Sequence, residues 1–269
     1  MEIVSKMLDA HTLRRCVDEA LSRISSQISV NDVEFARRVY TDGVDKYAAR
    51  LRQYGFGGLA RVLDAGCGFG QWALALSDGN REVTAVDVSE TRVTVVNSLV
   101  RNLGIRNLSA RTASLEKLPF ADGTFDGVFC YGALFLSRWK EALGEMVRVL
   151  RPMGHVYVNA NGIGWYKHLW YTHHNRTVDY DPCEIVANAF RNTVDYRRGR
   201  ATSPGKDIII EPDELRAELI RLGLEAIETA PEGRIGLGAG VVPETPPFFQ
   251  AEYMGDLGVY EVRARKGRG

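Results

Sequence analysis

Apolar residues recur at helical spacing through the first part of the chain. Across residues 8–29 they return every three to five positions, the pattern of an amphipathic helix. Asn31-Asp32 offers a cap for a second helix that runs toward Tyr54, with a break near Gly43. The glycine-rich stretch 55–58 ends this segment. We therefore expect an N-terminal helical cap over residues 1–58.

From Ala60 onward, short apolar runs alternate with helical stretches. The helical stretches lie near 71–77, 90–103 and 138–150. The runs that have the composition of β-strands are 61–66, 82–89, 108–114, 125–134 and 155–160. Strands that alternate with helices form right-handed crossovers and a mostly parallel sheet. Residues 59–160 therefore predict a doubly wound α/β core.

The alternation stops after Asn161. Residues 161–211 are rich in aromatics, His and Arg without a clear period, so we treat them as a separate inserted segment. The α/β pattern returns over 212–269, where a helix begins at Pro212 and ends at Gly223. Two further strands are expected near 224–229 and 259–266, with a Pro/Gly-rich loop, 231–249, between them.

Composition narrows the class of protein. The 269 residues are 45% hydrophobic and 25% charged, as in an ordinary globular chain and unlike a disordered one. Lys+Arg and Asp+Glu both number 34, and this zero balance argues against a protein that coats nucleic acid or a membrane surface. Its four cysteines lack metal-site spacing, so no metal is expected. Without a signal-peptide pattern or a spanning apolar run, the expected location is the cytoplasm.

The most informative stretch is RVLDAGCGFGQ, residues 61–71. An apolar strand leads into Gly66, Gly68 and Gly70, and a helix follows. Glycines here permit a tight turn and allow backbone N–H groups to approach a ligand. Asp87 ends the next expected strand, 21 residues beyond Gly66. That spacing suits a carboxylate that accepts the hydroxyl hydrogens of a ribose.

Two details separate this loop from the dinucleotide-binding fingerprint G-x-G-x-x-G. Position 71 is Gln rather than Gly, and Asp64 lies just before the loop. A carboxylate at that place repels a pyrophosphate and suits a cationic, amino-bearing ligand. A nicotinamide oxidoreductase is therefore the least favoured of the functions considered.

At this point the sequence resembles the class I S-adenosylmethionine-dependent methyltransferases of the small-molecule type. LDAGCGFG is similar to their first motif and Asp87 to their ribose-binding acid. LEKLPFADGTFDGVFCYGAL (115–134) resembles their adenine-site loop and fourth strand, and RVLRPMGHVYV (148–158) their turn into the fifth strand. The resemblance implies a Rossmann-like, seven-stranded sheet whose last strand is antiparallel and inserted beside the fifth. It also implies S-adenosyl-L-methionine as the cofactor.

Transferred position by position, the resemblance assigns the cofactor-binding residues. Asp64 orients the loop and the ammonium group, Asp87 takes the ribose hydroxyls, and Tyr131 begins the surface where the methyl group meets the acceptor. Ser114 stands where many members have Asp, so it bonds the adenine amino group without charge assistance. The remaining expected contacts are Gly66, Cys67, Gly68, Gly70, Val88, Arg92, the backbone of Leu115, and Tyr40 and Tyr47 from a covering helix.

The resemblance also implies that residues 161–211 are a lid inserted over the acceptor. This lid contains the candidates for acceptor chemistry. A hydroxyl acceptor needs a base, and His168, His173 and His174 are the candidates in this segment. Trp165, Tyr166, Trp170 and Tyr171 offer an aromatic wall, although a packed helix explains their spacing as well. Arg191, Arg197, Arg198 and Arg200 offer an anion site, although a solvated face is the more frequent reason for such a run.

These observations favour a methyltransferase that acts on a small-molecule or glycan-type acceptor, with transfer expected at oxygen. One alternative is an RNA or protein methyltransferase, although the neutral net charge of the chain disfavours it. A second alternative is a protein that binds the cofactor without catalysing a reaction. No nucleic-acid or membrane partner is expected. The N-terminal helices and the loop 231–249 offer surfaces for a homodimer. The sequence leaves the acceptor and the oligomeric state open.

Overall fold

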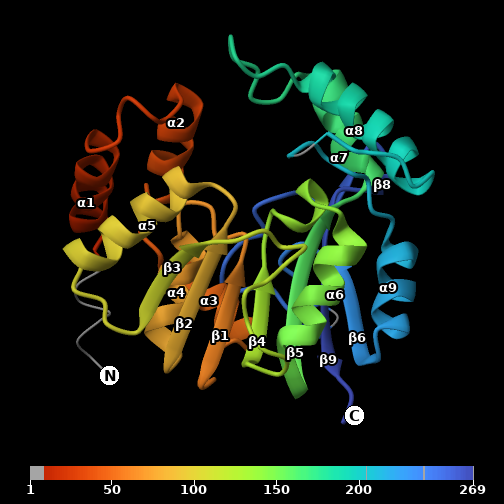
Figure 1. Cartoon of the computed structure of the whole chain (residues 1–269). Helices are drawn as coiled ribbons and strands as arrows, with labels where there is room; N and C mark the ends of the chain where they lie inside the picture. The colour runs from red at the N-terminus through yellow and green to blue at the C-terminus, as the bar shows by residue number, and fades with distance from the viewer. Residues whose placement is uncertain (1–8, 204, 239, 269) are drawn as a thin grey trace.

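The computed structural model describes residues 9–203, 205–238 and 240–268, and its centre is a sheet in the order β3-β2-β1-β4-β5-β9-β6 (Figure 1). The strands of this sheet are β1 Arg61–Ala65, β2 Glu82–Asp87, β3 Leu108–Thr112, β4 Phe125–Cys130, β5 Leu150–Asn161, β6 Leu224–Pro231 and β9 Val259–Lys266. Neighbouring strands from β1 to β5 pair in parallel. β9 pairs antiparallel with both β5 and β6, between which it is inserted. The doubly wound sheet predicted from the sequence is confirmed.

Helices cover both faces of the sheet. They are α1 Ala10–Ser22, α2 Val30–Val39, α3 Asp45–Gln53, α4 Gln71–Gly79, α5 Glu90–Asn102, α6 Trp139–Val149, α7 Ile163–Thr172, α8 Pro182–Arg197, α9 Pro212–Arg221 and a 3₁₀ turn at Leu134–Leu136. Side chains alternate along β1, so Val62 belongs to the apolar cluster that includes residues of α1, α3, α4 and α5, whereas Leu63 belongs to the cluster that includes residues of α6 and α9. Each face therefore has its own apolar core.

The N-terminal helices differ in detail from the expected ranges. The helix expected over 8–29 ends at Ser22, and Leu8 lies outside the described residues. The second helix begins after Ser29, whose side chain accepts a hydrogen bond from the Asp32 backbone N–H. The break near Gly43 is confirmed, because Gly43 has φ +75° and separates α2 from α3.

The lid is more regular than its sequence indicated. It forms α7 and α8, and Asp181 and Pro182 provide the cap and first turn of α8. Trp170 and Phe190 remain 46% and 49% exposed, so apolar residues do not mark a single buried stripe in this segment.

Two further differences concern strands. The hairpin of β7 Glu252–Tyr253 and β8 Asp256–Leu257 was not predicted. The strand expected over 125–134 ends at Cys130, before a turn at Gly132 with φ +72°.

The two helical additions flank one edge of the sheet. In Figure 1, β9 ends near the lower edge, so the parallel strands have their carboxyl ends at the upper edge. The pair α1–α2 lies at one side of that upper edge and the pair α7–α8 at the other. Open α/β sheets bind ligands beyond the carboxyl ends of their strands. Within the described ranges, no helix is both long enough and apolar enough to cross a bilayer.

Candidate cofactor and acceptor site

The glycine loop joins β1 to α4 at this edge. Gly66 and Gly70 have φ of +83° and +87°, a left-handed conformation that favours glycine. A Cβ at Gly66 would overlap the side chain of Ala133, and one at Gly70 would lie 2.9 Å from Val96 Cγ2. Gly68 has no atom within 4 Å of its Cβ position. The outer two glycines therefore allow close packing of the chain, while the middle one leaves open space over the loop.

Asp87 at the end of β2 is held by the loop backbone. Its Oδ2 accepts a hydrogen bond from the Gly68 N–H at 2.9 Å, and its Oδ1 accepts one from the Ser89 N–H at 2.9 Å. Each carboxylate oxygen has a second lone pair. The side chain is therefore fixed in orientation and retains acceptor capacity, as the predicted bonds to two ribose hydroxyls require.

Asp64, the neighbouring carboxylate on β1, has a different environment. It is only 1% exposed, and its Oδ2 has no hydrogen-bond partner. Burial, together with the nearby charge of Asp87, raises the pKa of Asp64 to about 8. A buried carboxylate oxygen without a partner is costly unless a ligand supplies one. The donor that fits this oxygen is a cationic group, such as the ammonium of an amino-acid ligand.

The expected adenine-side residues lie on two separate segments of the chain, one at 88–92 and one at 114–116. The Ser114 hydroxyl donates to the Glu116 carboxylate, and the Glu116 N–H is 3.3 Å from Ser114 Oγ. Val88 is exposed, and Leu115 is buried. Arg92 donates to Asp32 at 2.8 Å and lies 5.4 Å from the centroid of the Phe69 ring. Arg92 thereby ties the N-terminal helices to the glycine loop.

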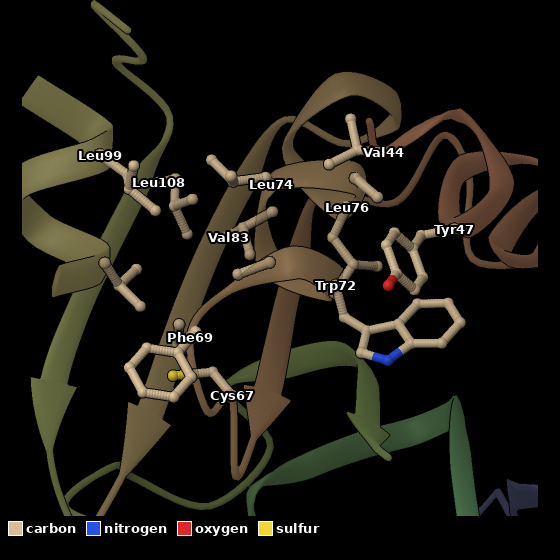
Figure 2. Packing of buried hydrophobic residues seen from close by; sticks show 14 of the residues in the cluster. Val44, Tyr47, Cys67, Phe69, Trp72, Leu74, Leu76, Val83, Leu99 and Leu108 are labelled. Atoms are coloured by element: carbon tan, nitrogen blue, oxygen red, sulfur yellow. The ribbon is translucent and has the colours of Figure 1, made fainter. Parts of the chain in front are cut away.

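Tyr40 and Tyr47 are both buried against this loop. The Tyr40 hydroxyl donates to the Phe69 carbonyl at 2.7 Å, and the Tyr47 hydroxyl donates to the Val39 carbonyl at 2.9 Å. The Tyr47 ring packs edge-on against Trp72 with a centroid distance of 4.8 Å, as Figure 2 shows. Cys67 and Phe69 belong to the same core and lie next to each other, away from this pair (Figure 2). The helical cap is thus bonded directly to the backbone of the loop.

Tyr131 follows β4 and is half-buried beside Trp72, with a centroid distance of 4.8 Å. Its hydroxyl lies 3.5 Å from Glu232 Oε1. Burial and the Glu232 carboxylate raise the pKa of Tyr131 well above its ordinary value, so the phenol stays neutral. Tyr131 therefore presents a neutral ring beside the glycine loop.

The structure brings two of the three lid histidines together. The rings of His168 and His174 have a centroid distance of 5.0 Å, and both lie against Trp165. Burial and the neighbouring His174 lower the pKa of His168, which keeps it neutral near pH 7 and able to accept a proton. His173 instead ends α7 in a left-handed conformation, with its Nδ1 3.6 Å from Cys183 Sγ.

A buried polar network next to Tyr131 was not expected from the sequence. Arg50 on α3 forms an ion pair with Glu232 at 2.8 Å, and neither side chain is exposed. The Tyr54 and Tyr157 hydroxyls both donate to Glu261 Oε2. The sequence contains one feature that could have indicated this network. Arg50 falls on the apolar stripe of α3, at helical spacing from Tyr47 and Tyr54. A charged residue on such a stripe indicates a buried partner.

A surface cavity of about 310 Å³ lies elsewhere, between α6, α8 and α9. None of the glycine-loop residues line it, and its wall includes the ion pairs Arg138–Glu141 and Arg197–Glu214. Because these charges are already paired, the cavity marks the junction of the lid with the core. Among the described residues, no cluster of three or more His, Cys, Asp or Glu side chains is placed to hold a metal ion.

Comparison with known proteins finds methyltransferases among the similar sequences. Residues 62–154 match the family described as a methyltransferase domain. The chain is 38% identical over 95 residues to the uncharacterized methyltransferase YcgJ of Bacillus subtilis, covering 35% of this chain and 38% of that protein. It is 34% identical over 101 residues to a demethylmenaquinone methyltransferase of Bacillus cytotoxicus, covering 36% and 43%. The matches thus span about two fifths of the length of these curated relatives.

Solved structures extend the likeness to most of the chain. The crystal structure of YcgJ aligns with a TM-score of 0.54 at 20% sequence identity, and the alignment covers 84% of this chain and 99% of the YcgJ chain. That of the [4+2]-cyclase SpnF has a TM-score of 0.56 at 20% identity and covers 84% and 81%. At this identity the likeness shows the fold alone.

The fold is a Rossmann-like α/β fold similar to that of solved methyltransferases, and the glycine loop is its candidate ligand site. Residues 62–154, about a third of the chain, are the part that matches the methyltransferase-domain family. Solved structures with a similar fold include proteins described as SAM-dependent methyltransferases, whose cofactor is S-adenosylmethionine. The residues present fit it, because Asp64 has an unpartnered oxygen for its ammonium and Asp87 has free acceptor capacity for its ribose.

Proposed function

We propose that this protein transfers a methyl group from S-adenosylmethionine to an oxygen of a small-molecule acceptor. The observation that supports this most directly is the buried, unpartnered Oδ2 of Asp64 beside Asp87 at the glycine loop. The same site thus offers two carboxylates: that of Asp64 for a cation and that of Asp87 for the two hydroxyls of a ribose. The cofactor supplies an electrophilic methyl group on a positively charged sulfur.

The chain's own residues align the reactants in this proposal. Gly66, Cys67, Gly68 and Gly70 form the floor under the cofactor, while Ser114 and the Leu115 N–H face the adenine edge between Val88 and Arg92. Tyr131 begins the acceptor side. Alignment of acceptor and methyl group lowers the barrier by several kcal/mol, since it removes the entropy cost of a bimolecular encounter.

His168 is the base that we favour for a hydroxyl acceptor. It is neutral near pH 7, partly exposed and adjacent to His174, the second candidate in the same cluster. His173 is the weaker candidate of the three, because its ring lies near Cys183. Single substitutions of these histidines at saturating acceptor test the assignment, and unchanged turnover in all three would remove it.

The names of the relatives favour a small, apolar acceptor. One relative is a demethylmenaquinone methyltransferase of Bacillus cytotoxicus, and another, 31% identical over 94 residues, is a sterol 4-C-methyltransferase of Caenorhabditis elegans. An RNA acceptor is less favoured because the formal charge of the chain is zero. Its four free cysteines suit a reducing location such as the cytoplasm.

Asp87→Ala tests the proposed function. We expect the affinity for S-adenosylhomocysteine to fall on the order of 100-fold, because charge-assisted hydrogen bonds to two hydroxyls are lost. Calorimetry measures the dissociation constant, and an unchanged unfolding curve confirms that the variant is folded. Asp78→Ala on the exposed side of α4 is the control. Equal affinity in Asp87→Ala and the native protein would contradict the assignment of the ribose site.

A cofactor-binding protein that does not catalyse methyl transfer is the second candidate. The likeness to SpnF supports it, since that protein is a [4+2]-cyclase and shares the fold. Cofactor binding without formation of S-adenosylhomocysteine across a broad panel of hydroxyl, amine and carbon acceptors would favour this alternative.

A further inference from the structure

Phe248 and Phe249 are consecutive residues whose rings lie in two different aromatic clusters. The Phe248 ring has centroid distances of 5.8 Å to Tyr47, 6.3 Å to Trp72 and 6.5 Å to Tyr131. The Phe249 ring instead lies edge-on to Trp165 of the lid, at 5.2 Å. This dipeptide therefore links the wall beside the glycine loop to the lid.

The lid cluster extends this aromatic surface. Trp165 lies 5.8 Å from Tyr253 on β7, and Tyr253 stacks on His168 with a centroid distance of 4.4 Å. Tyr131, Phe248, Phe249, Trp165, His168 and Tyr253 are all half-buried, neither sealed in the core nor fully exposed. The strip thus runs from the proposed methyl-transfer point to the proposed base.

The backbone that presents these two rings is held by buried charges. Glu232 Oε2 accepts the Phe248 N–H at 2.7 Å, while Arg50 Nη2 donates to the Thr245 and Pro246 carbonyls at 3.2 and 2.9 Å. Arg50 and Glu232 neutralise each other behind the loop. Pro246 and Pro247 further restrict the backbone that leads into Phe248. The rings are therefore preorganised, which reduces the entropy lost when a ligand binds.

We infer that Phe248 and Phe249 recognise the methyl acceptor, and that this acceptor carries a planar, uncharged ring that packs along the aromatic strip. Aromatic side chains bind flat rings by offset or edge-on stacking. The strip itself has no formal charge at neutral pH, since its only titratable base, His168, has a lowered pKa. The inference rests on the proposed function for the position of the methyl group, and it adds the substrate class.

The test uses 2-naphthol as the probe, titrated by calorimetry into the full chain with saturating S-adenosylhomocysteine. The variants are Phe248→Leu, Phe249→Leu and the double variant Phe248→Ala/Phe249→Ala. The leucine variants retain apolar volume and remove the ring. We expect each leucine variant to weaken 2-naphthol binding about 3- to 10-fold and the double variant to abolish it, with S-adenosylhomocysteine affinity unchanged. The anionic probe 2-naphthalenesulfonate should bind more weakly than 2-naphthol.

Phe190→Leu is the matched control, because Phe190 is an exposed phenylalanine on α8 outside both clusters. It should leave 2-naphthol binding unchanged. Equal 2-naphthol affinity in native protein and in both leucine variants would overturn the inference, as would S-adenosylhomocysteine binding without any 2-naphthol binding. If the native protein fails to bind S-adenosylhomocysteine, the proposed function fails instead. The same 2-naphthol titration without that ligand then still tests the aromatic strip.

Discussion

Two carboxylates at neighbouring strand ends acquire different properties from their surroundings. Asp87 accepts hydrogen bonds from two backbone N–H groups, whereas Asp64 Oδ2 has no partner. The cost of burying Asp64 therefore remains in the ligand-free protein, and a bound cation would relieve it. This difference turns a pair of similar residues into two distinct binding groups.

The buried carboxyl group of Asp64 should make the stability of the ligand-free protein depend on pH. Burial raises its pKa to about 8, so between about pH 4 and pH 8 the folded protein holds a proton that the unfolded chain has released. The stability of ligand-free protein therefore falls as the pH rises through this range. In Asp64→Asn the loss of unfolding free energy from pH 5 to pH 8 should be smaller by about 2–4 kcal/mol. Urea denaturation at the two pH values measures it.

The affinity for S-adenosylhomocysteine should also depend on pH through Asp64. In the native protein, S-adenosylhomocysteine should bind more tightly at pH 8 than at pH 6, because ionised Asp64 pairs with its ammonium group. Asp64→Asn should bind weakly at both values. Asp78→Asn serves as the control. Parallel pH profiles in Asp64→Asn and native protein would show that Asp64 is already ionised without ligand.

The loop glycines allow a matched comparison. Gly66 and Gly68 both have positive φ, so alanine costs about 1 kcal/mol of backbone strain at either position. Only at Gly66 would the new Cβ overlap Ala133. Gly66→Ala should therefore lower the free energy of unfolding by about 1–3 kcal/mol more than Gly68→Ala. Gly68→Ala should mainly weaken S-adenosylhomocysteine binding. Equal stability of the two variants would refute the packing argument.

At the scale of elements, α3 joins the loop 231–249 to the sheet through the Arg50–Glu232 pair. Arg50 also donates to the Tyr54 hydroxyl at 3.0 Å, and Tyr54 donates to Glu261 on β9. Burial raises the pKa of Glu232 and Glu261, while the Arg50 charge lowers that of Glu232. One helix, one loop and one strand therefore share a single buried network.

Removal of one partner should be costly at this pair. Arg50→Met should lower the free energy of unfolding by about 3–5 kcal/mol, because Glu232 is left buried and unpaired. The double variant Arg50→Met/Glu232→Gln should lose less than the sum of the two single variants. The exposed pair Arg52–Glu244, two residues along α3, is the control, and Arg52→Met should change stability by less than about 1 kcal/mol. Additive effects at Arg50 and Glu232 would contradict the coupling.

At the scale of the whole molecule, the lid is attached where α7 crosses the β7–β8 hairpin. The Gly162 N–H donates to the Gly258 carbonyl at 2.6 Å, and a Cβ at Gly164 would lie 2.7 Å from the Leu257 carbonyl oxygen. Lys167 pairs with Asp256 on the same hairpin. Backbone contact of this kind sets the position of the lid relative to the sheet.

Gly164→Ala should therefore disturb the lid and leave the cofactor side intact. We expect a loss of about 1–3 kcal/mol in unfolding free energy, with unchanged S-adenosylhomocysteine affinity, because the carbonyl groups that meet the new Cβ cannot move freely. The control is Gly144→Ala in α6, where nothing lies within 4 Å of the Cβ position. That variant should be more stable by about 0.5–1 kcal/mol. A stabilising Gly164→Ala would argue against the close contact.

Much of the fold followed from local pattern. Alternating apolar runs and helices over 60–160 predicted the doubly wound core, and the resemblance at 61–71 implied the antiparallel last strand. In the lid, a packed helix was one of two explanations for the aromatic spacing that became α7, and α8 was missed because exposed apolar residues obscured its period. The β7–β8 hairpin was missed because its strands have only two residues each.

The sequence by itself determined the order of elements, the glycine loop and the two acidic positions, because these depend on periodicity and on spacing over a few residues. Only the tertiary structure decided that Asp64 lacks a partner, that Arg50 meets Glu232, and that Phe248 and Phe249 face different clusters. Those properties arise from residues far apart in the sequence that burial brings together; Arg50 and Glu232, for example, are 182 positions apart. Burial and pairing are properties of the packed molecule, and no local pattern encodes them.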